Sequence, residues 1–302
     1  RLSTHFDQVG ARFSTPLPLR MGLVARGEAT VHDTHLPMLR TESREEVLGG
    51  SFGWRAQNRM LGQAKLTASP GASRLALDVI ANRRVTRPYD PMWSLDGYTT
   101  PCDDPLCAEG PVFSPTPQPG YSRYRGADHL AITHERGSAT VLSGTHAGGP
   151  AVLRAAAGWR HASAVTSLDG RDDASYLVPE RFPEFGLPES PKSQPFYVYR
   201  GDEPFFSRSA SDQWTVRADA QHTTRRGGVI KGGLGLLYDH AELHEIDYTI
   251  DEDGVDSLRQ YRVWAPGGYA YLQGRWIFEG LVAHGGLRIE CFDPGPQAAS
   301  QA

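Results

Sequence analysis

Long apolar runs are missing from this chain of 302 residues. A membrane-spanning helix needs about 18 to 20 consecutive apolar residues, and the longest run of small apolar residues, near Ala151–Ala157, is broken by Arg154. We therefore expect a soluble protein with no membrane span. The residues after Arg1 lack the charged start and apolar middle of a signal peptide. Both a cytoplasmic protein and a secreted one whose leader has been removed fit this start.

Lysine and asparagine are also scarce, since the chain contains only Lys65, Lys192 and Lys231, and only Asn58 and Asn82. This bias is typical of GC-rich bacterial codon usage and says little about function. The formal net charge is −4 at pH 7. Because a general nucleic-acid-binding protein needs a basic surplus to neutralise phosphates, we expect no nucleic-acid partner.

Cysteine is the third scarce residue, with three in the chain. Cys102 and Cys107 bracket a short Asp-Asp-Pro-Leu turn, while Cys291 stands alone. A Cys102–Cys107 disulfide is geometrically feasible and would favour an oxidising compartment, but two free thiols in a cytosolic protein fit equally well. No paired Cys-x-x-Cys units are present, which argues against a structural zinc site.

What the chain does contain is period-two alternation, which indicates strands with one apolar and one polar face. In Arg74–Val85, Leu75 and Leu77 share one face, and in Gln213–Gln221 the apolar face begins with Trp214. Regularly spaced strands with glycine and proline between them are typical of barrels and sandwiches. The sequence therefore predicts an all-β, antiparallel β-barrel or sandwich. Two packed lipocalin-like barrels are the preferred form, and a cupin-like or jelly-roll β-sandwich is the alternative.

Irregular segments indicate how the chain is divided. Residues 86–120 form a long loop rich in proline and aromatics, and loops of this length are usually functional or disordered. Five prolines within 179–195 indicate a connector. We therefore expect an N-terminal β domain over 1–178 and a C-terminal β domain over 196–302. A short helix is expected within Ala151–Ser163, and turns are expected at Glu135–Gly137 and Pro266–Gly268.

The densest chemistry lies on the predicted strand Leu236–Ile250. Alternation places His240, Glu242 and His244 on the face that ends in apolar residues, including Tyr248, so we expect these three to point inward. Buried titratable groups must pair, bind a metal or meet a polar ligand. A His–Glu pair supplies a general base whose tautomer is fixed by the carboxylate. The same three residues are the metal ligands if the protein is metal-dependent; otherwise we expect no cofactor. Solvated positions at a barrel mouth, with no catalytic role, are the remaining interpretation.

Six further residues are candidates for contacting a small-molecule substrate. They lie on the strand itself, follow a neighbouring strand, or lie in the long loop where aromatics and carboxylates mix: Tyr248, His222, Trp276, Arg275, Trp93 and Tyr98. We expect an enzyme of the lyase, isomerase, cyclase or hydrolase type that acts on a small, mainly apolar molecule in an enclosed β cavity. The alternatives are a carbohydrate-active β-sandwich enzyme or lectin, a metal-dependent cupin-like enzyme, and a non-catalytic carrier of hydrophobic ligands. The oligomeric state is not readable from the sequence.

Overall fold

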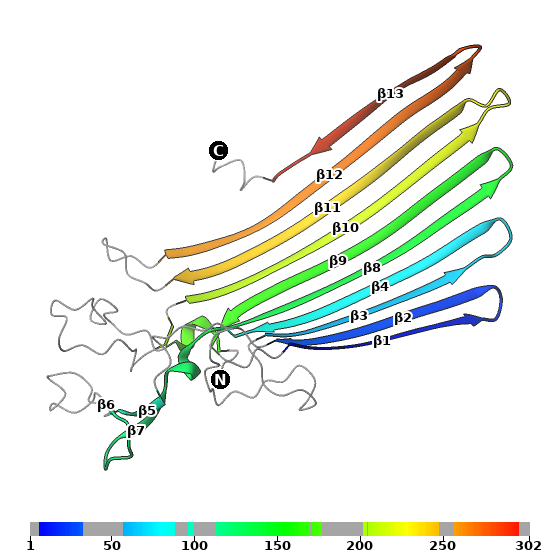
Figure 1. Ribbon diagram of the computed structural model, residues 1–302. Coiled ribbons are helices and arrows are strands. Elements are labelled where there is room, and N and C mark those ends of the chain that lie inside the picture. Colours follow the sequence, from blue (N-terminus) through cyan, green and yellow to red (C-terminus); the bar gives the residue numbers. More distant parts are fainter. Residues whose placement is uncertain are drawn as a thin grey trace.

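The computed structural model describes residues 6–32, 57–87, 96–99, 113–168, 171–176, 202–203, 205–247 and 257–295. Ten long strands form one antiparallel sheet in the order β1-β2-β3-β4-β8-β9-β10-β11-β12-β13 (Figure 1). Their bounds are Phe6–Leu17 (β1), Met21–His32 (β2), Gln57–Ala68 (β3), Ser73–Thr86 (β4), Ile132–Gly148 (β8), Ala151–Ser167 (β9), Phe205–Thr223 (β10), Val229–Asp247 (β11), Ser257–Phe278 (β12) and Leu281–Phe292 (β13).

A second, three-stranded sheet has the order β6-β5-β7. Its strands are Asp96–Thr99 (β5), Phe113–Ser114 (β6) and Ser122–Arg125 (β7), and two short 3₁₀ turns complete the described elements: η3 (Gly126–His129) and η4 (Asp173–Ser175). No helix in the described part of the chain is long and apolar enough to cross a membrane.

The all-β, antiparallel class predicted from the sequence is confirmed, and its strands lie in one large sheet. Each long strand packs mainly against its hydrogen-bonded neighbours. Strand β9 pairs directly with β10, so strands from both predicted domains share this sheet. The predicted connector 179–195 and the Cys102–Cys107 pair lie outside the described residues, and the division into two domains stays a prediction.

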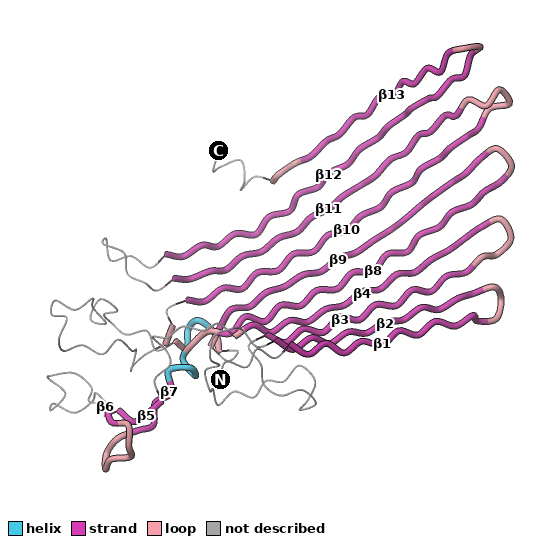
Figure 2. The backbone as a smooth tube through the Cα atoms, viewed as in Figure 1, coloured by secondary structure: helices cyan, strands magenta, loops and turns pink. Residues whose placement is uncertain are grey.

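The two ends of the large sheet differ in their connections (Figure 2). At one end, tight turns join β1 to β2, β3 to β4, β8 to β9, β10 to β11 and β12 to β13. We call this the turn end. At the opposite end, the loop end, the strands that follow one another are separated by longer stretches of sequence, and the small sheet lies there. Backbone conformations with positive φ make the tight turns feasible, as at Leu19, Arg20 and Gly149.

Three local predictions from the sequence were wrong, because the strands here are longer than the spacing of glycine and proline residues implied. The expected helix within Ala151–Ser163 is part of β9, and the expected turn at Glu135–Gly137 lies inside β8. Gly137 leaves room for a neighbour, since a Cβ there would lie 2.8 Å from Asn82 Oδ1. The expected turn at Pro266–Gly268 lies inside β12.

Pro266 is tolerated in β12 because its missing N–H faces away from β11. Its carbonyl accepts a hydrogen bond from the amide of Asp293, and in an antiparallel strand the nitrogen and oxygen of one residue point to the same side. That side faces the end of β13 at Phe292. The proline therefore costs no ladder bond to β11.

Fully buried side chains gather at the loop end, including Val85, Leu168 and Phe206. The buried carboxylate of Asp202 lies among them, 2.7 Å from His129 Nδ1 and 3.0 Å from an Arg171 nitrogen. These contacts satisfy a charge that would be costly to bury alone. The compact core of the described residues is therefore a small cluster at the loop end, and most of the sheet lies outside it.

Candidate functional site

The pairing register fixes which side chains share each face of the sheet, because residues directly opposite on neighbouring strands point the same way. One face, the apolar face, carries large hydrophobic side chains that remain exposed on β1, β4 and every strand from β8 to β13. They include Val9, Phe13, Leu75, Leu77, Val79, Leu142, Leu153, Val216, Leu234, Leu236, Leu272, Leu287 and Ile289.

Exposure on this face is extensive rather than scattered. The exposed fractions of Leu236, Leu272 and Leu287 are 62%, 61% and 69%. Contiguous apolar surfaces larger than a few hundred Å² mark sites of contact with membranes, proteins or ligands. The apolar face therefore needs an occupant that the described residues do not supply.

A row of aromatic side chains borders the apolar face toward the loop end. Trp159, Trp214 and Tyr238 lie directly opposite one another on β9, β10 and β11. The ring centroids of Trp214 and Tyr238 are 6.0 Å apart, and those of Tyr238 and Trp264 are 5.5 Å apart. These four rings, which we call the aromatic row, are each about 40% exposed. The next residues toward the loop end are polar, as at Asp212 and His240.

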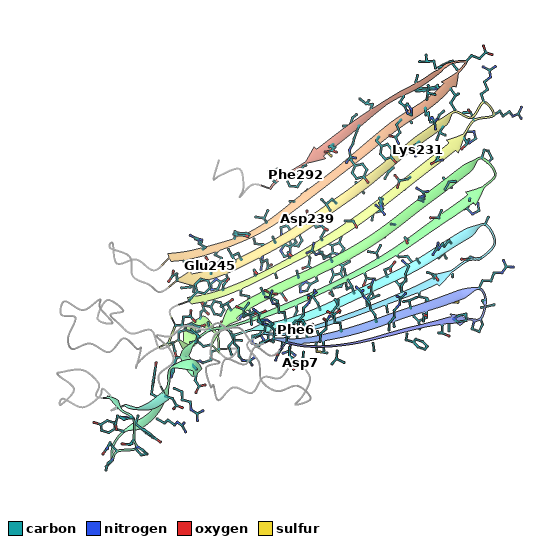
Figure 3. The ribbon with its side chains drawn as sticks, viewed as in Figure 1. Phe6, Asp7, Lys231, Asp239, Glu245 and Phe292 are labelled. Carbon is teal, nitrogen blue, oxygen red and sulfur yellow. The ribbon has the colours of Figure 1, made fainter. Side chains whose placement is uncertain are left out.

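The opposite, polar face carries charged and hydroxyl side chains along every long strand; Lys231, Asp239 and Glu245 mark it on β11 in Figure 3. Its cations are Arg12, Arg26, Arg59, Lys65, Arg74, Arg84, Arg154, Arg160, Arg217, Lys231, Arg259, Arg275 and Arg288. Its carboxylates are Glu28, Asp78, Glu135, Asp219, Asp239, Glu245, Asp247 and Glu290.

Some of these charges are paired across strands. Lys65 Nζ lies 3.0 Å from Asp78 Oδ2, and an Arg84 nitrogen lies 3.6 Å from Glu135 Oε2. Both ion pairs are partly exposed, so each contributes little to stability. The Tyr271 hydroxyl donates a 2.6 Å hydrogen bond to Asp219.

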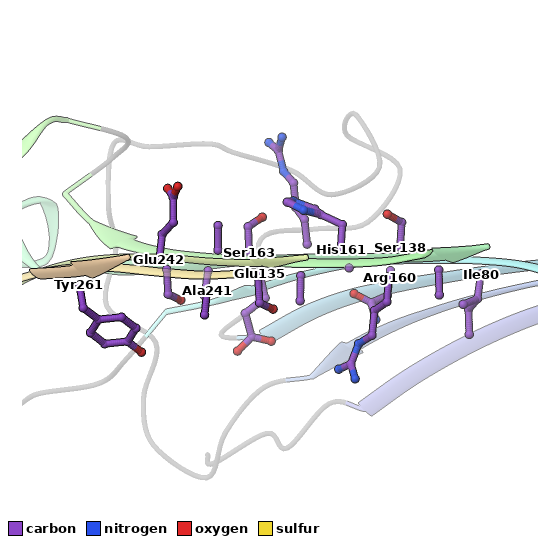
Figure 4. Close-up of a pocket in the computed structure, with 18 residues that line it drawn as sticks. Ile80, Glu135, Ser138, Arg160, His161, Ser163, Ala241, Glu242 and Tyr261 are labelled. Carbon is purple, nitrogen blue, oxygen red and sulfur yellow. The ribbon is translucent and has the colours of Figure 1, made fainter. Parts of the chain in front are cut away.

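Figure 4 views part of the sheet edge-on and separates the two faces. Glu242, Ser163 and His161 project to one side, whereas Arg160 and Ile80 project to the other. The residues that line the pocket in Figure 4 therefore project from both faces of the sheet. The N-terminal strands, in faint blue, bend toward the side of Arg160 and Ile80, which places the polar face on the concave side of the sheet.

The predicted residues His240, Glu242 and His244 share the apolar face of β11, between the aromatic row and the loop end. The His240 ring stacks on Trp264, with centroids 3.6 Å apart. His240 Nε2 lies 3.1 Å from Glu242 Oε1, although the two atoms are not aligned as a hydrogen bond. Glu242 also pairs with Arg262, whose Nε is 2.7 Å away. His240, Glu242 and Arg262 therefore form one cluster of an imidazole, a carboxylate and a guanidinium.

His244 has a separate partner, because its Nε2 lies 3.0 Å from Asp173 Oδ2 on η4. This hydrogen bond from His244 holds the pKa of the Asp173 carboxyl below its ordinary value. The His244 ring also meets Phe206 edge-on at 5.8 Å. Among the described residues, no three His, Cys, Asp or Glu side chains are arranged to hold a metal ion.

The remaining predicted substrate contacts do not gather around this cluster. His222 and Trp276 are on the apolar face at the turn end, and Arg275 is on the polar face there. Tyr98 belongs to β5 of the small sheet. The other two predicted contacts, Trp93 and Tyr248, lie outside the described residues.

The sequence contains a pattern that predicts both the apolar and the polar face of the sheet. Alternation in Gln213–Gln221 predicts an apolar and a polar face, whereas the inward assignment was made on Leu236–Ile250 alone. The stronger signal is repetition: the same alternation recurs on strand after strand, with tight turns at one end and long loops at the other. Transmembrane β-barrels carry this pattern.

Comparisons with known proteins give a match among solved structures but none by sequence. No protein-family model and no curated protein matches this sequence. Among solved structures, the fold is similar to that of the outer membrane transporter YddB from Escherichia coli, with a TM-score of 0.53 and 13% sequence identity. The match covers 95% of this chain and 34% of that one, so this chain spans about a third of its length.

Proposed function

We propose that this chain forms part of the wall of a membrane-spanning β-barrel that carries a solute across an outer membrane. The observation that supports this proposal most strongly is the uncovered apolar face with its aromatic border. Lipid acyl chains are an occupant that needs no specific complementarity, only apolar side chains over the right height. The proposal departs from the expectation of a soluble protein, which rested on the absence of long apolar runs.

The height of the apolar face fits a bilayer. On β10 this face is free of charged and histidine side chains between Asp212 and His222, a span of about 33 Å at the usual rise per residue. A strand tilt of about 45° reduces this to about 23 Å. The apolar band of transmembrane barrels is about 25 Å tall and is bordered by aromatic girdles. The aromatic row occupies the corresponding position on β9 to β12.

The concave polar face suits a water-filled lumen, since barrel strands alternate between lipid-facing and lumen-facing residues. The short turns and long loops at opposite ends also follow the barrel pattern. Among the described strands, β1 and β13 pair on one side only, so closing the wall requires partner strands at both edges. Transport is inferred from the similarity to a protein whose name describes an outer membrane transporter.

Paired lysine substitutions on β10 test whether the apolar face contacts lipid. Val216→Lys would place a charge near the centre of the apolar band, and Thr215→Lys would place the same charge one residue away on the polar face. We expect Val216→Lys to destabilise the protein in phospholipid vesicles by about 2–4 kcal/mol. Thr215→Lys should change the free energy of unfolding by under about 1 kcal/mol. The free energy of unfolding by urea, followed by tryptophan fluorescence, gives both values.

The full-length protein without substitution is the reference in that experiment. Equal costs for the two lysines, or a stable monomeric fold in lipid-free, detergent-free buffer, would contradict a lipid-facing surface.

Acid–base catalysis at His240, Glu242 and His244 is a second candidate, favoured by the 3.1 Å approach of His240 to Glu242. In this function the carboxylate would orient the imidazole as a general base. We expect Glu242→Gln to lower turnover at least about 100-fold if the pair is catalytic. The measurement is a screen of small esters, epoxides and hydroxy acids; unchanged turnover in both Glu242→Gln and His244→Ala would eliminate this candidate.

A further inference from the structure

The polar face is basic over one part of the sheet. On β1 to β9 it carries eight lysine and arginine side chains but three carboxylates, whereas on β10 to β13 the two kinds are equal in number. The whole chain has a formal charge of −4. The cations are therefore concentrated on this surface in a chain that is acidic overall.

Six of the eight are arginines that form no ion pair with a described residue, whereas Lys65 and Arg84 have carboxylate partners. All six are exposed. We call them the arginine ladder: Arg12, Arg26, Arg59, Arg74, Arg154 and Arg160.

The register arranges this ladder at three levels along the strands. Arg154 and Arg160 are six residues apart on β9, and the third level crosses β9 at Ala164. At about 3.3 Å per residue, the levels are separated by about 20 Å and 13 Å. The ladder therefore runs for about 33 Å along the strands, the same length as the apolar band on β10. A solute moving along this face would meet arginine at each level.

One level holds two ladder arginines directly opposite each other, because Arg12 faces Arg26 on β1 and β2. At another level Arg59 faces Arg84, whose charge is already paired with Glu135. Like charges at such cross-strand positions are destabilising. A carboxylate, phosphate or sulfate group between them would relieve the repulsion, because the guanidinium fork matches these anions.

We propose that the arginine ladder binds a small anionic solute and guides it along the polar face from one end of the sheet to the other. This inference rests on the proposed function, in which the concave face lines a water-filled passage. Basic side chains lining a pore select anions, and a concave surface of one sign raises the local concentration of the opposite charge. Several spaced sites allow the solute to enter and leave, where one tight site would retain it.

Binding of a trianionic pyrene sulfonate dye to the full-length protein in neutral detergent micelles tests the ladder. Fluorescence anisotropy at low ionic strength gives the Kd for the wild type and for Arg160→Gln. We expect the substitution to raise Kd about three- to tenfold, and salt to weaken binding of the wild type because exposed charges are screened. Arg160→Lys keeps the charge and should stay within about twofold of the wild type.

Arg136→Gln is the matched control. Arg136 is exposed on neighbouring β8 but shares the apolar face, and among the described residues it has no ion-pair partner. Arg136→Gln changes the net charge of the protein as much as Arg160→Gln does, and it should leave Kd within about twofold of the wild type. No dye binding, equal binding of a cationic dye of similar size, or equal effects of Arg136→Gln and Arg160→Gln would overturn the proposal. The lysine pair on β10 reports on lipid contact separately, so a failure of the membrane wall and a failure of the ladder give different results.

Discussion

At the scale of single residues, the polar face shows how glycine and tyrosine depend on each other across strands. Gly235 pairs with Tyr269, and Gly233 pairs with Tyr271. A Cβ at Gly235 would lie 2.5 Å from Tyr269 Cε1, and one at Gly233 would lie 2.6 Å from Tyr271 Cε1. Each ring therefore lies over the backbone of a glycine and covers it, a pairing that stabilises a strand residue with no side chain of its own.

Replacing Gly235 by alanine should destabilise the sheet by about 1–3 kcal/mol, because the added methyl group displaces the Tyr269 ring. Gly27→Ala on β2 is the matched control, since nothing lies within 4 Å of a Cβ there. It should be neutral or slightly stabilising, because alanine restricts the unfolded chain more than glycine does. Chemical unfolding of both variants gives the two free energies, and a loss at Gly27 equal to that at Gly235 would show that the ring contact is not the cause.

At the scale of strands, alternation predicted the faces well and the lengths poorly. The assignment of Leu75 and Leu77 to one face of β4 is confirmed by the register, because side-chain direction follows from strand periodicity alone. Strand ends were wrongly predicted at Gly137 and Pro266, which lie inside β8 and β12, because tertiary neighbours decide at both positions. Glycine and proline normally mark turns, but Asn82 fills the space at Gly137 and the N–H side of Pro266 faces the end of β13. Neither neighbour is visible in the local sequence.

At the scale of the molecule, the sequence predicted the all-β class but left open what covers each face. Alternation assigns His240, Glu242 and His244 to the same face as Ile246 without stating whether that face meets protein, lipid or water. That question depends on which strands are neighbours and on the curvature of the sheet, both of which are long-range properties. The stacking of His240 on Trp264 and the hydrogen bond between His244 and Asp173 likewise join residues that are far apart in the sequence.

The most direct test of the membrane wall is a nitroxide scan along β10 in lipid vesicles. Single cysteines at Thr215, Val216, Arg217 and Ala218, in a background where Cys102, Cys107 and Cys291 are serine, carry the spin label. We expect a period of two: labels at Val216 and Ala218 collide more with oxygen, which concentrates in the bilayer, and labels at Thr215 and Arg217 collide more with a water-soluble nickel chelate. Equal access to the chelate at all four positions, or the reverse alternation, would contradict a lipid-facing apolar surface.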